Sequence, residues 1–323
     1  MADIVGVGSP VMDLVINVSK IPRGNGFTGA NEIFHQGGGN CASAMAASAR
    51  LGAKTGMLAK VGGDKTGDFV IKDLQFNGVD TSRILRGPPD TSSPYCLSVS
   101  EIDEGTRFFV GRRNAVMVAR MEPSELDYEY LSRAKIVHID SGSPVSIAAA
   151  KYAREKGIKV TIDAGGFSQD RVDAIPFVDV YIASDMFYNG MFRDNPDDME
   201  GNCRKLHEMG PEVVWITRGE HGCCGLVDGK FYNVPAFKIE AKDTTGAGDV
   251  FHGAYAAAML EGLSHPECAR YASAVSAIKC MYVGGRTGIP NREILRRFLE
   301  DGTVMNEELD ARLEYYRKNF IYL

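Results

Sequence analysis

The sequence predicts an α/β protein with a doubly wound, mostly parallel sheet flanked by helices and a small β-sheet lid. Two observations carry this prediction. Beyond about residue 122, short apolar runs alternate with helical runs, which is the pattern of βαβ units and a parallel sheet. The extended segments at about 12–35 and 92–112 interrupt that alternation, so we assign them together to a protruding lid. We expect residues 1–323 to form one domain that carries this lid.

The first 50 residues predict three strands and one helix. Residues 4–8 form an apolar strand, and residues 13–18 and 27–34 form two more strands, joined by a turn rich in Pro and Gly at 22–26. Three glycines follow. Residues 40–50 are rich in Ala, Ser and Met, which favours a helix whose small side chains pack closely against a sheet or a ligand.

The rest of the chain supplies the other lid strands and the βαβ units. Residues 95–100 and 107–110 are extended on either side of an Asp-Glu-Gly turn and complete the lid. Strands or extended segments are predicted at 136–139, 159–162, 178–182, 213–217 and 230–238, and helices at 145–156, 199–209, 250–260, 265–280 and 291–299. The charge spacing of 307–318 predicts a surface helix or a contact between subunits.

Composition excludes several classes of protein. The 323 residues are 44% hydrophobic and 24% charged, which excludes disordered, collagen-like and low-complexity architectures. The formal net charge of −6 lacks the basic excess of a duplex-binding protein, so no nucleic-acid partner is expected. No apolar run approaches the roughly 18 residues of a membrane span and no signal peptide begins the sequence, which predicts a cytoplasmic protein without a membrane partner. Seven cysteines without a C-x-x-C pair favour free thiols and no zinc site.

Residues 243–249, Asp-Thr-Thr-Gly-Ala-Gly-Asp, carry the clearest chemical signal. They lie between an extended segment and a helix. The small residues Gly246, Ala247 and Gly248 let a ligand approach the backbone amides, and a helix N-terminus attracts an anion such as phosphate. Asp249 in the first turn could then take a proton from a hydroxyl that attacks the phosphorus. The plainer alternative is a Gly-rich turn with an Asp cap.

Residues 243–254 resemble the C-terminal signature of the ribokinase-like (PfkB-type) carbohydrate kinases. Four further stretches resemble motifs of that family and occur in the family's order: Gly37-Gly38-Gly39 with the Ala-rich helix and 51–53, then 61–67, 217–222, and 279–280 with 284–290. One such match is weak, but five in order along nearly the whole chain are specific. The pattern is most similar to the ketohexokinase and sulfofructose-kinase-like members.

The resemblance implies an ATP-dependent kinase that transfers the γ-phosphoryl group to a hydroxyl of a small sugar, a ketohexose or pentose such as fructose or ribose. It also implies the doubly wound sheet with a β-lid. Asp249 would be the catalytic base, and the amides of Gly246, Ala247 and Gly248 would form the anion hole. The implied sugar contacts are Asp13, Gly38, Gly39 and Asn40. The implied nucleotide-binding residues are Thr217, Gly219, Gly222, Gly246, Gly248 and Lys279.

The resemblance further implies two metal ions. Mg²⁺ would arrive on the nucleotide phosphates. The family often binds a monovalent cation such as K⁺ beside its signature, and the residues that match its ligands are Asp243, Thr245, Gly285 and Thr287. Residues 183–187 depart from the family, because they lack the N-x-x-E motif that is tied to Mg²⁺ and phosphate binding.

Several residues have a structural and a functional interpretation. Ser43 stands where the family usually has an Asn that contacts the sugar, and we keep it as a candidate contact. Arg112 and Arg113 follow a lid strand and either belong to a solvated loop or contact a phosphate of the substrate or product. Asp64 is typical of a turn or a helix cap. His252 lies one turn after Asp249, either packed in its helix or close to the site.

Three functions remain open at this stage. The leading one is a sugar kinase. The second is a nucleoside kinase of the same fold, which needs a wider and more apolar acceptor pocket. The third is a catalytically silent sugar-binding regulator, which the intact Asp249 and the glycines before it argue against. One face of a small lid must be buried, so we expect the lid to close on the sugar, and a homodimer through the lids is a further expectation.

Overall fold

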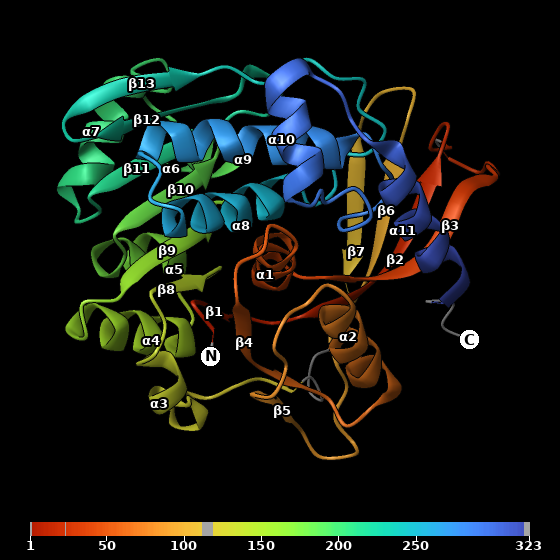
Figure 1. Cartoon of the computed structure of the whole chain (residues 1–323), viewed down its shortest axis with the longest axis horizontal. Helices are drawn as coiled ribbons and strands as arrows, with labels where there is room; N and C mark the ends of the chain where they lie inside the picture. Colours follow the sequence, from red (N-terminus) through yellow and green to blue (C-terminus); the bar gives the residue numbers. More distant parts are fainter. Residues whose placement is uncertain (1, 23, 112–118, 320–323) are drawn as a thin grey trace.

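The large sheet is the predicted doubly wound one. Among the residues that the computed structural model describes, 2–22, 24–111 and 119–319, nine strands pair in the order β13-β12-β11-β10-β9-β8-β1-β4-β5 (Figure 1). Neighbours from β5 to β11 are parallel, and β12 and β13 add an antiparallel edge. The strands are β1 (Ile4–Val7), β4 (Thr55–Val61), β5 (Ile84–Arg86), β8 (Ile136–Ile139), β9 (Lys159–Ala164), β10 (Val180–Ser184), β11 (Val213–Thr217), β12 (Cys223–Val227) and β13 (Lys230–Val234).

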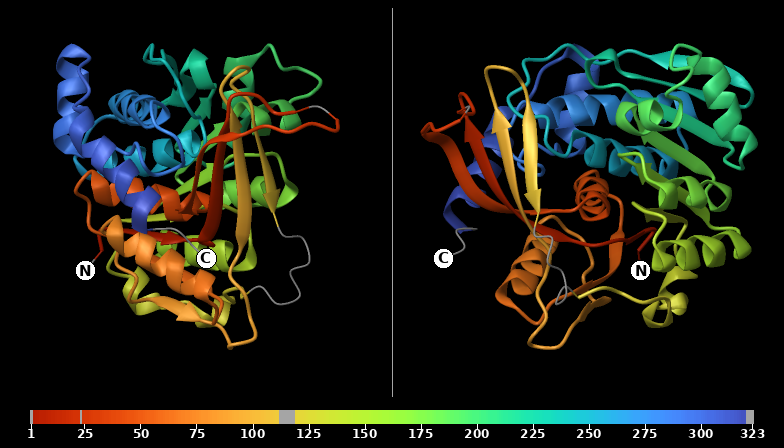
Figure 2. Two further views of the ribbon diagram at one scale, coloured as in Figure 1. Left: turned by 90° about the vertical axis from the view of Figure 1, so that its right-hand side faces the viewer. Right: turned by 180° about the vertical axis from the view of Figure 1, so that it is seen from behind.

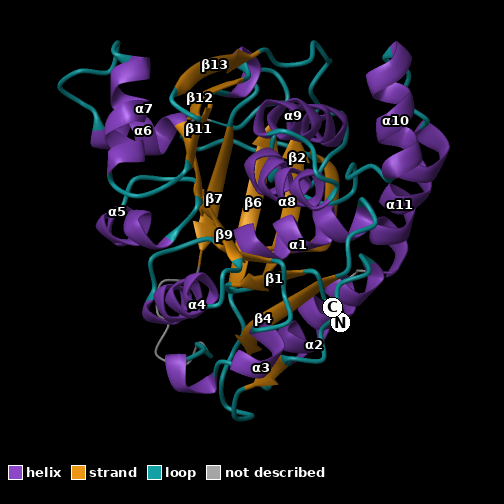
Figure 3. Ribbon diagram, turned by 60° about the vertical axis from the view of Figure 1, so that its left-hand side comes forward, coloured by secondary structure: helices purple, strands orange, loops and turns teal. Residues whose placement is uncertain are grey.

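Helices cover both faces of this sheet (Figure 3). One layer holds α3 (Tyr128–Leu131), α4 (Pro144–Glu155), α5 (Gln169–Ala174), α6 (Asp185–Met191) and α7 (Met199–Glu208), and the other holds α1 (Asn40–Arg50), α8 (Ala247–Leu260), α9 (His265–Cys280) and α10 (Arg292–Asp301). Short 3₁₀ turns lie at Pro123–Glu125, Ile175–Phe177 and Gly219–His221. Alternate strand residues supply the two cores: Val5 and Val7 face the first layer and Ile4 the second. Burial on both faces explains the continuous apolar runs in the sequence.

The predicted lid is a separate four-stranded sheet. Its order is β3 (Ala30–Gly38), β2 (Val11–Val18), β6 (Tyr95–Glu101) and β7 (Arg107–Gly111). Figure 2 shows these strands standing beside the large sheet. Part of the lid packs within the chain, because Met12, Val15 and Phe34 share a core with α2 (Lys65–Phe76) and with Tyr316 of α11 (Asn306–Asn319). The predicted tail helix therefore covers the lid. Association of two copies through the lids stays a prediction.

Some boundaries differ from the sequence-based ones. β3 ends at Gly38, not at residue 34, so two of the three glycines belong to the strand and Gly39 caps α1 with a φ of 89°. The elements that were not predicted are β4, β5, β12, α2, α3, α5 and α6. Asp64 is a helix cap, as expected, since its carboxylate accepts a hydrogen bond from the Gly67 amide at 2.8 Å. Within the described residues, no helix combines the length and the apolar character needed to cross a membrane.

Candidate active site

The loop before α8 presents an open backbone edge. Gly246 has a φ of 72°, which suits glycine, and it turns the chain into the first residue of the helix, Ala247. A Cβ on Gly246 would lie 3.0 Å from the Cα of Gly285, so the two loops approach closely. A Cβ on Gly248 would meet nothing within 4 Å. The predicted anion-binding residues thus lie at a helix N-terminus with free space in front of Gly248.

Asp249 occupies the first turn of α8 beside that space. The residue as a whole is half-buried, but its carboxylate is surrounded by protein. The surrounding protein disfavours its charged form and, together with the negative charge of Asp163, raises its pKa to about 7, although His252 opposes this shift. Asp13 and Asp140 raise the pKa further. A carboxylate whose pKa is about 7 can accept a proton near neutral pH.

Two of these acidic neighbours were missed from the sequence. Asp163 lies near the carboxyl end of β9, and Asp140 directly follows β8. The Asp140 carboxylate accepts a hydrogen bond from the Cys41 amide at 3.0 Å, and burial raises the Asp140 pKa to about 6. Both positions follow the rule that ligands of parallel sheets bind at the carboxyl ends of the strands, and that rule could have found them.

The consecutive glycines make room for charged side chains. A Cβ on Gly38 would lie 2.0 Å from Oδ2 of Asp13, and a Cβ on Gly37 would lie 2.3 Å from Oδ2 of Asp73. Burial raises the pKa of Asp13 to about 7, the Arg286 charge opposes the shift, and Asp73 adds to it. Asp13 and Gly38, both assigned to the sugar site from the sequence, are therefore in direct contact.

The buried Arg286 side chain contacts several of these residues. Its guanidinium donates to the Gly38 carbonyl at 2.9 Å, forms an ion pair with Asp73, and lies 3.3 Å from the Ser43 hydroxyl. Ser43 is buried, and its oxygen therefore supports the guanidinium that holds Gly38. The predicted contact Asn40 instead lies at the start of α1, where its amide donates to Oδ2 of Asp163 at 3.2 Å.

The residues predicted to bind nucleotide fall into two groups. Gly219 has a φ of 53° and a Cβ there would meet nothing within 4 Å, so its backbone faces open space after Thr217 at the end of β11. Gly222 is different, because a Cβ would lie 2.1 Å from the Val234 carbonyl oxygen. Its φ of 78° and this close packing explain the glycine without any ligand. Lys279 is fully buried, and its side chain reaches the loop that contains Asp243.

That loop holds the residues predicted to bind a monovalent cation. The Asp243 carboxylate accepts hydrogen bonds from the amides of Thr245 and Gly284, each at 2.8 Å. The Lys279 ammonium donates to the Asp243 carbonyl at 2.8 Å. Burial opposes ionisation of Asp243, but the Lys279 charge and these amides outweigh it and lower the pKa. Since the chain already supplies the positive charge and the donors here, we assign no step to K⁺, and dependence on K⁺ stays a prediction.

Thr287 and Gly285 were also predicted to bind the monovalent cation. The Thr287 hydroxyl donates to the Val283 carbonyl, within the same turn. Gly285 lies against Gly246, as described above. Over the described ranges, no group of three or more His, Cys, Asp or Glu side chains is arranged to hold a metal ion. Direct ligands for Mg²⁺ are therefore not assigned.

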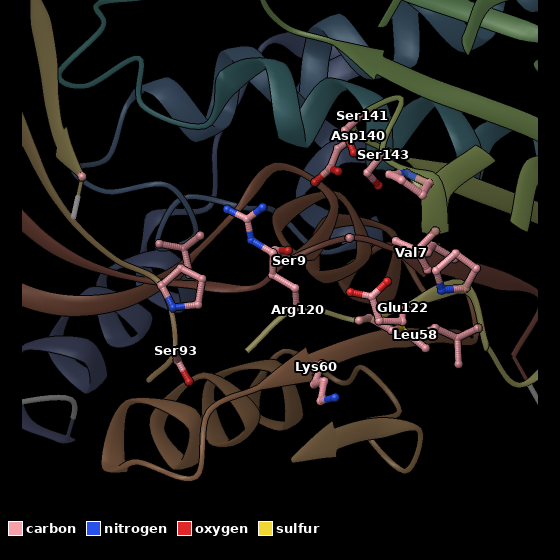
Figure 4. Close-up of a pocket in the computed structure, with 18 of the residues that line it drawn as sticks. Val7, Ser9, Leu58, Lys60, Ser93, Arg120, Glu122, Asp140, Ser141 and Ser143 are labelled. Atoms are coloured by element: carbon pink, nitrogen blue, oxygen red, sulfur yellow. The ribbon is translucent and has the colours of Figure 1, made fainter. Parts of the chain in front are cut away.

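A cavity of about 620 Å³ opens beside the Asp140 carboxylate, under the lid. It is lined by strand ends and loops of both sheets, including Ser9, Lys60, Tyr95, Arg120, Asp140 and Ser143 (Figure 4). Asp140 joins the cavity to the site, because it lines the cavity and also acts on the pKa of Asp249. Arg112 and Arg113 lie outside the described residues. In the sequence they fall between Gly111 and Arg120, and it is Gly111 and Arg120 that line the cavity.

The chain resembles known kinases along most of its length. Residues 1–292 match the model described as the pfkB family carbohydrate kinase. A nucleoside kinase of Methanothermobacter thermautotrophicus is 27% identical, over 92% of this chain and 95% of its own. A ribokinase of Haemophilus influenzae is 26% identical, over 91% and 97%. The crystal structure of a putative ribokinase from Agrobacterium tumefaciens superposes with a TM-score of 0.82 at 25% identity, covering 93% of this chain and 99% of that one.

Proposed function

Because the chain belongs to the pfkB family of carbohydrate kinases, we propose that it transfers the γ-phosphoryl group of ATP to a hydroxyl of a small sugar, with Asp249 as the general base. The observation that carries this proposal is the pairing of a carboxylate of raised pKa with the open backbone edge at Gly248, on the same helical turn. The acceptor class we favour is a neutral ketohexose or pentose, such as fructose or ribose.

The chain's own residues can perform each part of this reaction. Asp13 and Asn40 would hold hydroxyls of the sugar, which both groups can do by accepting hydrogen bonds. Asp249 would take the proton of the attacking hydroxyl. The amides around Gly248 and the positive end of α8 would stabilise the charge on the transferring group. Mg²⁺ bound with ATP would neutralise charge on the nucleotide phosphates.

ATP would approach from the other side of the same helix end. Gly219 leaves its backbone accessible after β11, and we assign it with Thr217 to the nucleotide. Closure of the lid strands β2, β3, β6 and β7 over the acceptor would exclude water, which otherwise competes with the sugar for the γ-phosphoryl group.

A nucleoside kinase is the second candidate, and the cavity favours it. A volume of about 620 Å³ lies within the usual range of small-molecule pockets, about 300–1,000 Å³, and also has room for a ligand larger than a monosaccharide. A nucleoside could place its ribose near Asp13 and its base between Tyr95 and Val145, both of which line the cavity.

One assay separates these candidates. ADP formation is followed in a coupled assay with ATP and Mg²⁺ against a panel of neutral pentoses, ketohexoses and nucleosides, and kcat/KM is compared. We expect one acceptor class to support turnover and the Asp249→Asn variant to lose about 10²–10⁴ in kcat. Absence of turnover with every acceptor, or an Asp249→Asn variant that keeps the wild-type kcat, would contradict the proposal.

A further inference from the structure

Behind Asp249 lies a fully buried carboxylate that the proposed chemistry does not use. Asp163, near the end of β9, is only 1% exposed. It lies between two elements that carry the proposed site: one oxygen accepts a hydrogen bond from the Asn40 amide of α1 at 3.2 Å, and the other lies 3.3 Å from Nε2 of His252 in α8. A buried carboxylate is costly unless it is paired, and here both of its oxygens have partners.

The two partners connect Asp163 to opposite halves of the reaction. Asn40 is a proposed contact for the sugar. His252 follows Asp249 by three residues on α8, so the two side chains lie on neighbouring positions of one helix face. Through these contacts, β9 at the centre of the sheet fixes the start of α1 relative to the start of α8.

Given the proposed function, we propose that Asp163 is a positioning residue, which aims the Asn40 amide at the acceptor, anchors the turn that carries Asp249, and keeps a fixed negative charge beside that base. It touches neither substrate in this role. Its effect on the reaction passes through the two residues that it holds and through its charge.

The electrostatics of the site agree with this role. Burial alone would raise the pKa of Asp163, but the charge of His252 and the hydrogen bonds from His252 and Asn40 outweigh it and lower the pKa to about 2. Asp163 thus stays ionised over the working range of pH. After burial, its charge makes the largest contribution to raising the pKa of Asp249.

Other charged groups also face Asp249 and must be accounted for. They are Asp13 of β2 and Asp140 after β8, which raise its pKa, and His252 of its own helix, which lowers it. The Cys41 thiol of α1 lies near enough for the Asp249 charge to act on it, but burial holds that thiol neutral, with a pKa well above its usual value. The His138 ring of β8 lies 5.7 Å from that of His252, and burial lowers its pKa to about 3, which leaves it neutral.

The test measures kcat/KM against pH for the wild type and for Asp163→Asn, which keeps the shape and removes the charge. Removing a negative charge beside Asp249 eases its ionisation. The acid limb should therefore move to lower pH, on the order of one pH unit for a charge within about 10 Å. The acceptor KM should rise, because a neutral amide oxygen holds Asn40 by a weaker hydrogen bond than the carboxylate does, while the ATP KM stays within about twofold of the wild-type value.

A matched control separates this effect from the loss of any buried charge. Asp179 is 6% exposed and accepts a hydrogen bond from the Val160 amide at 2.7 Å, at the opposite end of β9. Asp179→Asn removes the same charge from the same sheet and should lower stability without moving the acid limb. A shift of the limb in this control equal to that in Asp163→Asn would overturn the inference.

A second variant keeps the inference falsifiable if Asp163→Asn fails to fold. His252→Gln retains an N–H donor for Asp163 and removes the interaction that opposes the raised pKa of Asp249, so the acid limb should move to higher pH, opposite to Asp163→Asn. An acid limb that stays in place in every folded variant of Asp163 and His252 overturns the positioning role. That outcome leaves the proposed function intact, whereas a wild type that phosphorylates no acceptor overturns both.

Discussion

Gly248 offers a test in which stability and activity should change in opposite directions. A methyl group added there meets no atom within 4 Å, and the residue has no left-handed backbone conformation. Gly248→Ala should therefore fold without strain. Because alanine is a better helix former than glycine, the variant should be more stable by up to about 1 kcal/mol.

If phosphate binds the amides of α8 across this open space, as we propose, the same methyl group would obstruct its approach. Loss of one donor of such an anion hole typically costs about 10²–10³ in kcat. Gly248→Val, with a branched side chain, should lose more. The assay is the coupled ADP measurement, combined with urea unfolding of the same preparations.

Gly29 supplies the matched control for this prediction. A Cβ on this exposed lid residue also meets nothing within 4 Å, so Gly29→Ala adds the same group away from the helix. We expect wild-type kcat in this control. A stable Gly248→Ala enzyme with undiminished kcat would refute a close approach of phosphate to this backbone.

Four further predictions concern the acceptor, the base, the nucleotide loop and the lid. Asp13→Ala should raise the acceptor KM strongly and leave the ATP KM nearly unchanged, since it removes an acceptor for sugar hydroxyls; equal changes in both would contradict its assignment. The base works only when ionised, so the raised Asp249 pKa predicts a wild-type kcat/KM that falls below about pH 7. Gly222→Ala should lower the unfolding midpoint in urea, because its Cβ would lie 2.1 Å from a carbonyl oxygen. Hydrogen exchange in 12–34 and 93–111 should slow when the sugar is added, and protection confined to other regions would argue against closure of the lid.

The elements with a clear period were the ones that the sequence could predict. The helices at 40–50 and 265–280 and the strand at 136–139 have the predicted bounds, because each shows one uninterrupted apolar pattern. The segment 61–67 contains three glycines and reads as a loop, which hid the end of β4 and the start of α2. There the Asp64 side chain caps the helix, because its carboxylate accepts a hydrogen bond from the Gly67 amide.

The candidate site was predictable where local chemistry marks it and not where distant residues meet. The turn at Gly246–Asp249 carries its signal in consecutive residues, since glycines at a helix N-terminus favour an anion by themselves. The contact between Asn40 and Asp163 joins residues 123 positions apart, and only the parallel order of the strands brings them together. In the sequence, an Asn or an Asp with a distant partner of this kind looks the same as any other polar residue at the end of a strand.

The glycines of the family motifs have two different physical reasons, and the difference decides which of them can be tested through activity. Gly248 faces open space and has no left-handed backbone conformation, so nothing in the fold requires a glycine there, and a ligand is the remaining reason for its small size. Gly219 also faces open space, but its φ of 53° favours glycine by itself. Gly38 and Gly222 are already explained by close contacts within the chain, with the Asp13 carboxylate and with a strand carbonyl. Substitution at Gly38, Gly219 or Gly222 disturbs packing or backbone conformation first, whether or not a ligand binds. A change at Gly248 therefore reports on the reaction, and changes at the other three report on the frame that holds it.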